Sequence, residues 1–259
     1  MEITPGEFDL AKLTTDEFAK LLGGPRPVVV MIPVGSVEPH GPHLSLVTDT
    51  VISHSAALRA ARILKDGGLV ALVAPVVPYG VTECAAAFRG AISVSPQALT
   101  GFLRDLVEAF LADEVAHVCL VNNHLEPDHD AAVRAAIDGI TDGRASVASP
   151  LARRWARTLS REFKSGACHA GRYETSIILA ATPELVNDEV RKELAEVPIS
   201  LSDKLKSGVT DFAKMGLSRA YSGSPADAST AHGDEQLARL ATMVATEIRE
   251  GLARLAGQS

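Results

Sequence analysis

Apolar runs alternate along the chain with segments in which apolar residues recur every three or four positions. The runs are typical of strands buried on both faces of a sheet, and the recurring spacing is typical of amphipathic helices. This alternation predicts an α/β fold in which a mostly parallel central sheet has helices on both faces. We expect strands at 27–32, 69–77, 115–121 and 145–148.

Local signals mark the starts of several predicted helices. Thr14 and Glu17 have the spacing of a capping box, and Ser95 followed by Pro96 is a favourable helix start. Residues 199–233 show little periodicity and are typical of a surface or interface segment. We expect helices at 15–22, 50–64, 95–113, 127–139 and 151–163. A further helix should open near Glu174 and end at 182, and the last one, at 234–255, has a single apolar stripe.

Composition sets limits on the class of protein and its partners. No repeat or linker divides the 259 residues, so we expect one globular domain over 1–259. The formal net charge of −7 argues against a sequence-independent nucleic-acid binder, and no apolar stretch approaches the length of a membrane span. The N-terminus is acidic and lacks the apolar core of a signal peptide. We therefore expect a cytoplasmic protein with neither a nucleic-acid nor a membrane partner.

Acidic and imidazole side chains follow the first predicted strand. Glu38, His40, His43 and Asp49 lie within a dozen residues of one another, where the strand leaves the sheet. Ligands of open parallel sheets bind at the carboxyl ends of the strands, and this mixture of oxygen and nitrogen groups suits zinc, manganese or iron. Taken alone, the same pattern fits a polar loop whose side chains hydrogen-bond to the backbone.

A second cluster of the same kind favours the metal site. The third predicted strand, at 115–121, is followed by Asn122, Asn123, His124, Leu125 and Glu126. Two strand ends of one sheet that each carry a histidine and a carboxylate are hard to explain as packing. We therefore expect both clusters to contribute ligands to one centre.

Three motifs together resemble the creatininase (creatinine amidohydrolase) family. The stretch IPVGSVEPHGPHLSLVTDT at 32–50 is similar to the family signature, and the His-x-Glu of the second cluster follows it in the family order. The segment CHAGRYETS at 168–176 resembles the family's third motif. The resemblance covers roughly 27–186 and implies a single-domain three-layer sandwich with a mostly parallel sheet.

The resemblance also implies a metal-dependent hydrolase of a C–N bond in a small amide or cyclic amide. One divalent metal ion would bind Glu38 and His124, and a second would bind His40 and Glu126. The ions would be zinc or manganese, with iron as a further option. Asp49 would bridge the two ions, which would share a hydroxide that attacks the amide. His169 would pass a proton to the leaving nitrogen. Glu174 is expected either to assist as an acid or to cap a helix start.

Further candidates border the expected substrate pocket, and some depart from the family pattern. Loop 78–92 borders the substrate in creatininase relatives, which makes Glu83 and Arg89 candidates, with surface solvation as the alternative. Leu125 stands where the family has an aromatic residue. We therefore expect a pocket without an aromatic wall, a poor creatininase and a polar or anionic substrate. The remaining substrate-binding candidates are Arg172 and Tyr173.

Other interpretations remain open from the sequence. The chain could hydrolyse a lactone or a C–C bond, deformylate a formamide in cofactor biosynthesis, or be a metal-binding relative without activity. Arg153, Arg154 and Arg157 form a basic segment that is either a solvated helix face or a site for an anionic substrate. From the resemblance we also expect a small-molecule substrate and a homo-oligomer, with a hexamer favoured.

Overall fold

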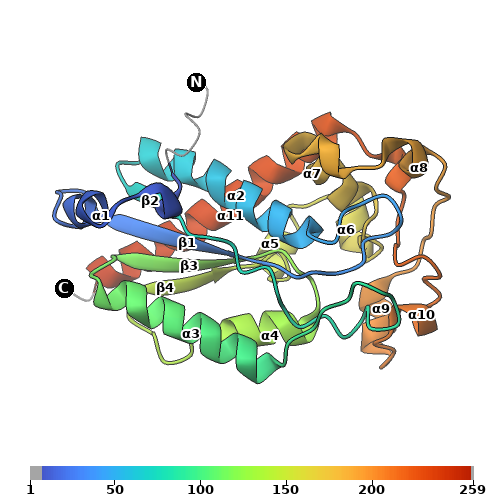
Figure 1. Cartoon of the computed structure of the whole chain (residues 1–259), viewed down its shortest axis with the longest axis horizontal. Helices are drawn as coiled ribbons and strands as arrows, with labels where there is room; N and C mark the ends of the chain where they lie inside the picture. Colours follow the sequence, from blue (N-terminus) through green and yellow to red (C-terminus); the bar gives the residue numbers. More distant parts are fainter. Residues whose placement is uncertain (1–7, 258–259) are drawn as a thin grey trace.

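A parallel four-stranded sheet forms the centre of the computed structural model, which describes residues 8–257 (Figure 1). The first seven residues, on which the argument against a signal peptide partly rests, lie outside the described residues. The strands run in the order β2-β1-β3-β4, and every neighbouring pair is parallel. Their bounds are β1 Val28–Val34, β2 Val70–Val73, β3 His117–Asn122 and β4 Ala145–Ala148.

Helices cover both faces of the sheet and bury its two central strands completely (Figure 1). One face packs against α2 (Thr48–Asp66), α7 (Arg172–Ala181) and α11 (Thr230–Ala256). The opposite face packs against α1 (Thr15–Leu22), α3 (Pro96–Ala112) and α4 (Pro127–Ala135). The expected α/β architecture of three layers is confirmed.

Several boundaries follow from single residues. The capping box is present. The side chain of Thr14 accepts a hydrogen bond from the backbone N–H of Glu17, and the side chain of Glu17 accepts one from the backbone N–H of Thr14. Strand β2 is shorter than expected, since Pro75 has no N–H for the ladder, and pairing resumes only as an isolated bridge at Val77.

Two segments differ from the sequence expectation. The single helix expected at 151–163 is two short helices, α5 (Arg153–Ala156) and α6 (Arg161–Ser165), because the side chain of Ser160 accepts from the Phe163 N–H and starts a new helix. Residues 199–233 contain α9 (Leu201–Lys206) and α10 (Phe212–Met215), and their apolar side chains pack against Cys84 and Ala85. This segment therefore packs against another part of the same chain, the loop that contains Cys84 and Ala85.

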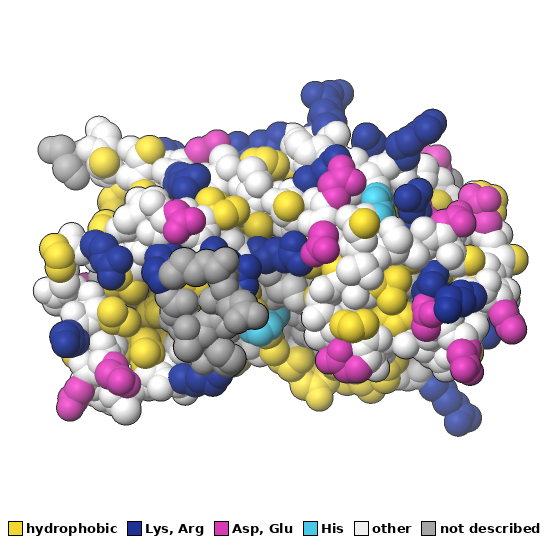
Figure 2. Space-filling model, turned by 90° about the horizontal axis from the view of Figure 1, so that it is seen from above, with side chains coloured by type: hydrophobic (Ala, Val, Ile, Leu, Met, Phe, Trp, Pro, Cys, Tyr) yellow, Lys and Arg dark blue, Asp and Glu magenta, His cyan; other side chains and the backbone are white. Residues whose placement is uncertain are grey.

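The remaining elements are short. They are η1 (Leu10–Lys12), η2 (Pro183–Leu185), α8 (Asp188–Lys192) and η3 (Pro225–Asp227). Figure 2 shows Lys and Arg interspersed with Asp and Glu over one broad face of the molecule. Within residues 8–257, every helix is too short or too polar to cross a bilayer.

Candidate active site

The two sequence clusters meet where β1 and β3 end. These strands are neighbours in the sheet, with Val34 opposite Asn122, so the loops that follow them leave from the same edge. Glu38 and His124, which are far apart in the sequence, come within 3.1 Å of each other, measured from Oε2 to Nδ1. Both side chains are almost completely buried. The parallel register therefore brings the clusters into one buried site.

Two imidazoles each hold one nitrogen in a hydrogen bond to a backbone carbonyl and turn the other nitrogen towards this site. A backbone carbonyl only accepts hydrogen bonds, so His40 must donate from Nδ1 to the Glu38 carbonyl at 3.0 Å. In the same way His124 donates from Nε2 to the Val81 carbonyl at 2.7 Å. In the neutral rings, His40 Nε2 and His124 Nδ1 are left as electron-pair donors facing inward, and His40 Nε2 has no hydrogen-bond partner in the structure. Hydrogen bonds of this kind fix the tautomer of metal-binding histidines.

Asp49 lies between the two imidazoles. Its Oδ1 is 3.2 Å from His40 Nε2, and its Oδ2 is 2.9 Å from His124 Nδ1. The Ser36 hydroxyl donates to Oδ2 at 2.8 Å, and Asp49 itself sits in the first turn of α2, where the helix dipole favours a negative charge. Burial opposes ionisation of Asp49, but the two imidazoles outweigh it and hold the pKa well below its usual range.

Two further carboxylates, those of Glu126 and Glu174, complete the cluster. Glu174 Oε2 lies 3.6 Å from His40 Nε2, and His40, Asp49 and Glu174 are close enough to share one ion. Glu126 instead groups with Glu38 and His124. The structure therefore brings Glu174 close to His40 in addition to Asp49, and the pairing of His40 with Glu126 that the family resemblance implies stays a prediction.

The cluster carries more negative charge than the protein neutralises. Four carboxylates are buried together, and within the described residues no Lys or Arg pairs with any of them. Burial raises the pKa of Glu174 to about 8, with the charges of Asp49 and Glu38 adding to the effect against the pull of His40. The facing carboxylates overcome burial at His40 and raise its pKa to about 10. Four carboxylates with two inward nitrogen donors match the charge and donor types that two divalent cations require.

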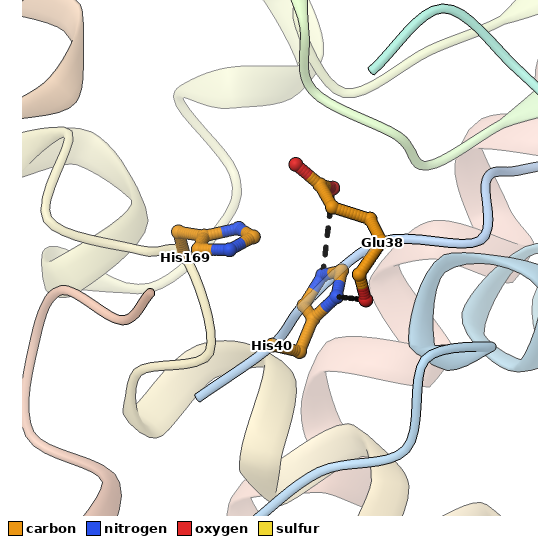
Figure 3. Close-up of side chains that lie close together, drawn as sticks. All are labelled: Glu38, His40 and His169. Carbon is orange, nitrogen blue, oxygen red and sulfur yellow. Dashed lines mark hydrogen bonds and ion pairs between the residues drawn. The ribbon is translucent and has the colours of Figure 1, made fainter. Parts of the chain in front are cut away.

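His169 approaches this cluster from a different segment (Figure 3). It comes from the turn before α7, where Ala170 adopts a left-handed backbone with φ of 50° and donates its N–H to Glu174. His169 donates from Nε2 to the Pro39 carbonyl at 2.9 Å, and its ring centroid is 4.4 Å from that of His40. Burial and the charge of His40 lower the pKa of His169 to about 4. Its Nδ1 is thus a neutral proton acceptor at the site.

A cavity of about 720 Å³ opens onto the cluster. Its inner end contains Glu38, Asp49, His124, His169 and the other two carboxylates. Its walls include Leu125, Phe163 and Phe212, and the ring of Phe212 lies 4.6 Å from that of His169. The expectation of a pocket without aromatic side chains is therefore wrong. Sequence reasoning missed these phenylalanines because they come from segments outside the motifs, where no local signal marks them.

The structure separates the proposed substrate-binding residues. Leu125 lines the cavity, whereas Glu83, Arg89 and Arg172 are exposed and Tyr173 is buried in the core against Phe163. None of the latter four is among the residues that line the cavity. Glu83 contributes through its backbone, because its N–H and that of Cys84 donate to the Glu126 carboxylate at 3.0 and 3.1 Å.

Comparison with known proteins identifies the family of this fold and site. The model of the creatininase family, described as creatinine amidohydrolase, matches residues 11–248. The chain belongs to the creatininase family. Two curated relatives are each named mycofactocin precursor peptide peptidase. The Mycobacterium ulcerans protein is 32% identical over 164 residues, or 61% of this chain and 60% of that protein. The Mycobacterium tuberculosis protein is 30% identical over 79% of this chain and 78% of its own length.

Solved structures agree with this assignment at the level of the fold. A structure titled "Creatininase Mn" superposes with a TM-score of 0.73 at 22% identity, covering 94% of this chain and 98% of that one. Family membership makes this creatininase-family chain a hydrolase, and the buried clusters above are its candidate metal-binding groups.

Proposed function

We propose that the chain is a single amidohydrolase domain that cleaves an amide C–N bond at a centre of two divalent metal ions. One ion would be held by Glu38, His124 and one oxygen of Asp49, and the other by His40, Glu174 and the second oxygen of Asp49. The observation that carries this proposal is the buried group of four carboxylates, which faces one nitrogen each of His40 and His124 and no Lys or Arg among the described residues.

The donor set is consistent with zinc or manganese, which bind imidazole and carboxylate ligands. Solved creatininases are titled as manganese and Zn–Zn forms. When bound, such ions polarise a carbonyl group and lower the pKa of a coordinated water. The hexameric assembly and the cytoplasmic location expected from the sequence stay predictions.

The chain's own groups would handle protons and hold the reacting atoms in place. The Nε2–H of His169 is held by the Pro39 carbonyl, which leaves Nδ1 without a proton in the neutral ring, so Nδ1 would accept a proton and deliver it to the leaving nitrogen. Glu126 is fixed beside Glu38 and His124 by two backbone N–H groups. It would serve as a second proton acceptor.

The size and lining of the cavity favour a peptide over a compact cyclic amide. A volume of about 720 Å³ falls within the range of sites that enclose drug-sized ligands, and Leu125, Phe163 and Phe212 offer apolar contacts beyond the reacting bond. The mycobacterial relatives are named as peptidases, which is consistent with a peptide amide as substrate. We propose short peptides as the substrate class and expect poor turnover of creatinine.

Metal reconstitution tests this function directly. Protein stripped with a chelator is reloaded with zinc or manganese and analysed for metal content. It is then assayed for amine release from a mixture of N-acetylated random tetrapeptides and, separately, from creatinine. We expect two metal equivalents per chain and peptide hydrolysis only by loaded protein. Trace metal in every preparation, or loaded protein that releases no amine from peptides, would overturn the proposal.

A further inference from the structure

Four cationic side chains surround the mouth of the cavity. Arg153 and Arg157 extend from α5 and the residue after it, Lys164 from α6, and Lys206 from the end of α9. All four are exposed, whereas every acidic residue that lines the cavity belongs to the buried cluster. The cavity therefore has an acidic floor and a basic rim. We call these four residues the cationic rim.

Most of the cationic rim has no partner within the chain. Among the described residues, Arg153, Arg157 and Lys164 make no ion pair, and Lys206 meets only the exposed carboxylate of Asp203 at 3.3 Å. Exposed pairs of that kind contribute little free energy. The rim's charged groups are thus available to a ligand.

The neighbouring Arg154, on the same helix, has acidic partners within the chain. Its guanidinium pairs with Glu250 at 2.9 Å and with Glu247, and it lies 4.6 Å from the ring centre of Trp155. Arg154 does not line the cavity. Arg153 and Arg157, four residues apart and therefore on one helical face, line the cavity instead.

The rim also differs from the face shown in Figure 2 and, in sign, from the net charge of the chain. Both signs of charge are interspersed over the face shown in Figure 2, and the chain as a whole carries −7. Four cations at a cavity mouth, of which only Lys206 meets an acidic side chain, concentrate a positive potential there, which attracts anionic ligands and raises their rate of association.

We propose that the substrate is a peptide with a free carboxylate, which Arg153 and Arg157 bind while the amide to be cleaved lies over the acidic cluster. This inference rests on the proposed function. Arginine matches a carboxylate with two parallel hydrogen bonds, whereas Lys164 and Lys206 act as point charges that steer it to the mouth. The apolar wall between floor and rim, including Leu125, Phe163 and Phe212, fits apolar residues between the amide and the carboxylate.

Three synthetic mixtures test the carboxylate and identify its source. Each contains N-acetylated random tetrapeptides without tryptophan. The first ends in a free carboxylate, the second in a carboxamide, and the third in a carboxamide preceded by glutamate. Metal-loaded protein is assayed for kcat/KM by amine release. Binding is followed separately through the fluorescence of Trp155, the single tryptophan of the chain, which lies two positions after Arg153 in α5.

We expect the free acid to be preferred over the plain carboxamide by roughly tenfold or more, because hydrogen bonds to charged groups contribute at about that level. The R153Q/R157Q variant should reduce this preference to near parity. It should also weaken the dependence of kcat/KM on salt concentration. A matched control, R62Q/R161Q, removes two exposed cations outside the cavity lining and should keep the preference. If kcat/KM for the glutamate mixture equals that for the free acid, the site binds either a C-terminal or a side-chain carboxylate.

The outcomes separate this inference from the proposed function. Two results would overturn the carboxylate site without contradicting the proposed amidohydrolase function. One is equal turnover of acid and carboxamide by the parent protein, and the other is a preference for the acid that persists in R153Q/R157Q. Binding that favours the acid and depends on Arg153 and Arg157, without amine release from any mixture, supports the carboxylate site and overturns the proposed function.

Discussion

Strand β3 has a buried histidine near each end, and the two differ only in what faces their second nitrogen. His117, at the start of the strand, donates from Nδ1 to the Gly143 carbonyl and accepts at Nε2 from the Ser146 hydroxyl, both at 2.8 Å. His124, just beyond the end, donates to the Val81 carbonyl, but its other nitrogen faces the carboxylates of Asp49 and Glu38.

This difference separates a structural histidine from a candidate metal ligand. Burial lowers the pKa of His117 to about 4, so the ring is neutral, and both of its nitrogens have protein partners. Burial acts on His124 in the same direction, but the carboxylates of Glu38 and Asp49 outweigh it and raise the pKa well above its usual range. Residue type and burial alone would not distinguish them. The charge facing the second nitrogen does.

The largest expected effect comes from removing that charge with Asp49→Asn. The carboxylate faces both His40 and His124, so we expect loss of both metal ions and a fall in kcat/KM of about 10³-fold or more, equivalent to several kcal/mol of transition-state stabilisation. Metal analysis and peptide hydrolysis measure the two effects. His117→Gln serves as the control and should keep its metal. An Asp49→Asn protein with two bound ions would show that Asp49 does not bridge them.

A smaller effect is expected at His169, which lies beside the cluster but is proposed to move protons. His169→Asn should lower kcat by about 10²–10⁴-fold, the range typical of a general acid–base group, and should leave the metal content at two ions. Loss of metal together with activity would instead assign His169 as a ligand, since Glu38, His40 and His169 are also close enough to share an ion.

The sequence predicts the floor of the cavity much better than its rim. Glu38, His40, Asp49, His124 and Glu126 follow two recognisable strands, and the neighbouring positions of parallel strands bring them together. The pairing of Glu174 with His40 depends on how α7 packs against the sheet, which no local pattern records.

The walls and rim depend on tertiary contacts between segments with weak periodicity. Phe212 belongs to the segment 199–233, whose apolar side chains find partners only when it folds against Cys84 and Ala85. Arg153 and Arg154 look alike in the sequence, and only the position of Glu247 and Glu250 on α11 decides which one is neutralised. Such choices are set by packing between distant elements.

The smallest expected effect concerns His117 and appears in stability alone. Its pKa of about 4 in the folded protein lies below the ordinary value of 6.5, so the unfolded chain binds the proton more readily. The stabilisation is complete above pH 6.5 and is lost as the pH falls towards 4, amounting to roughly 3 kcal/mol in the free energy of unfolding. His117→Gln removes this titration, while the histidines near the site titrate equally in both proteins. Denaturant unfolding of the metal-free proteins should therefore give a difference in the free energy of unfolding that narrows by about that amount between pH 7 and pH 4. The metal-loaded variant should hydrolyse peptides at pH 7 within about twofold of the metal-loaded parent. If the free energies of unfolding of the two proteins instead change in parallel with pH, the pKa of His117 is not lowered in the fold. His117 and His124 would then differ in position but not through a lowered pKa at His117.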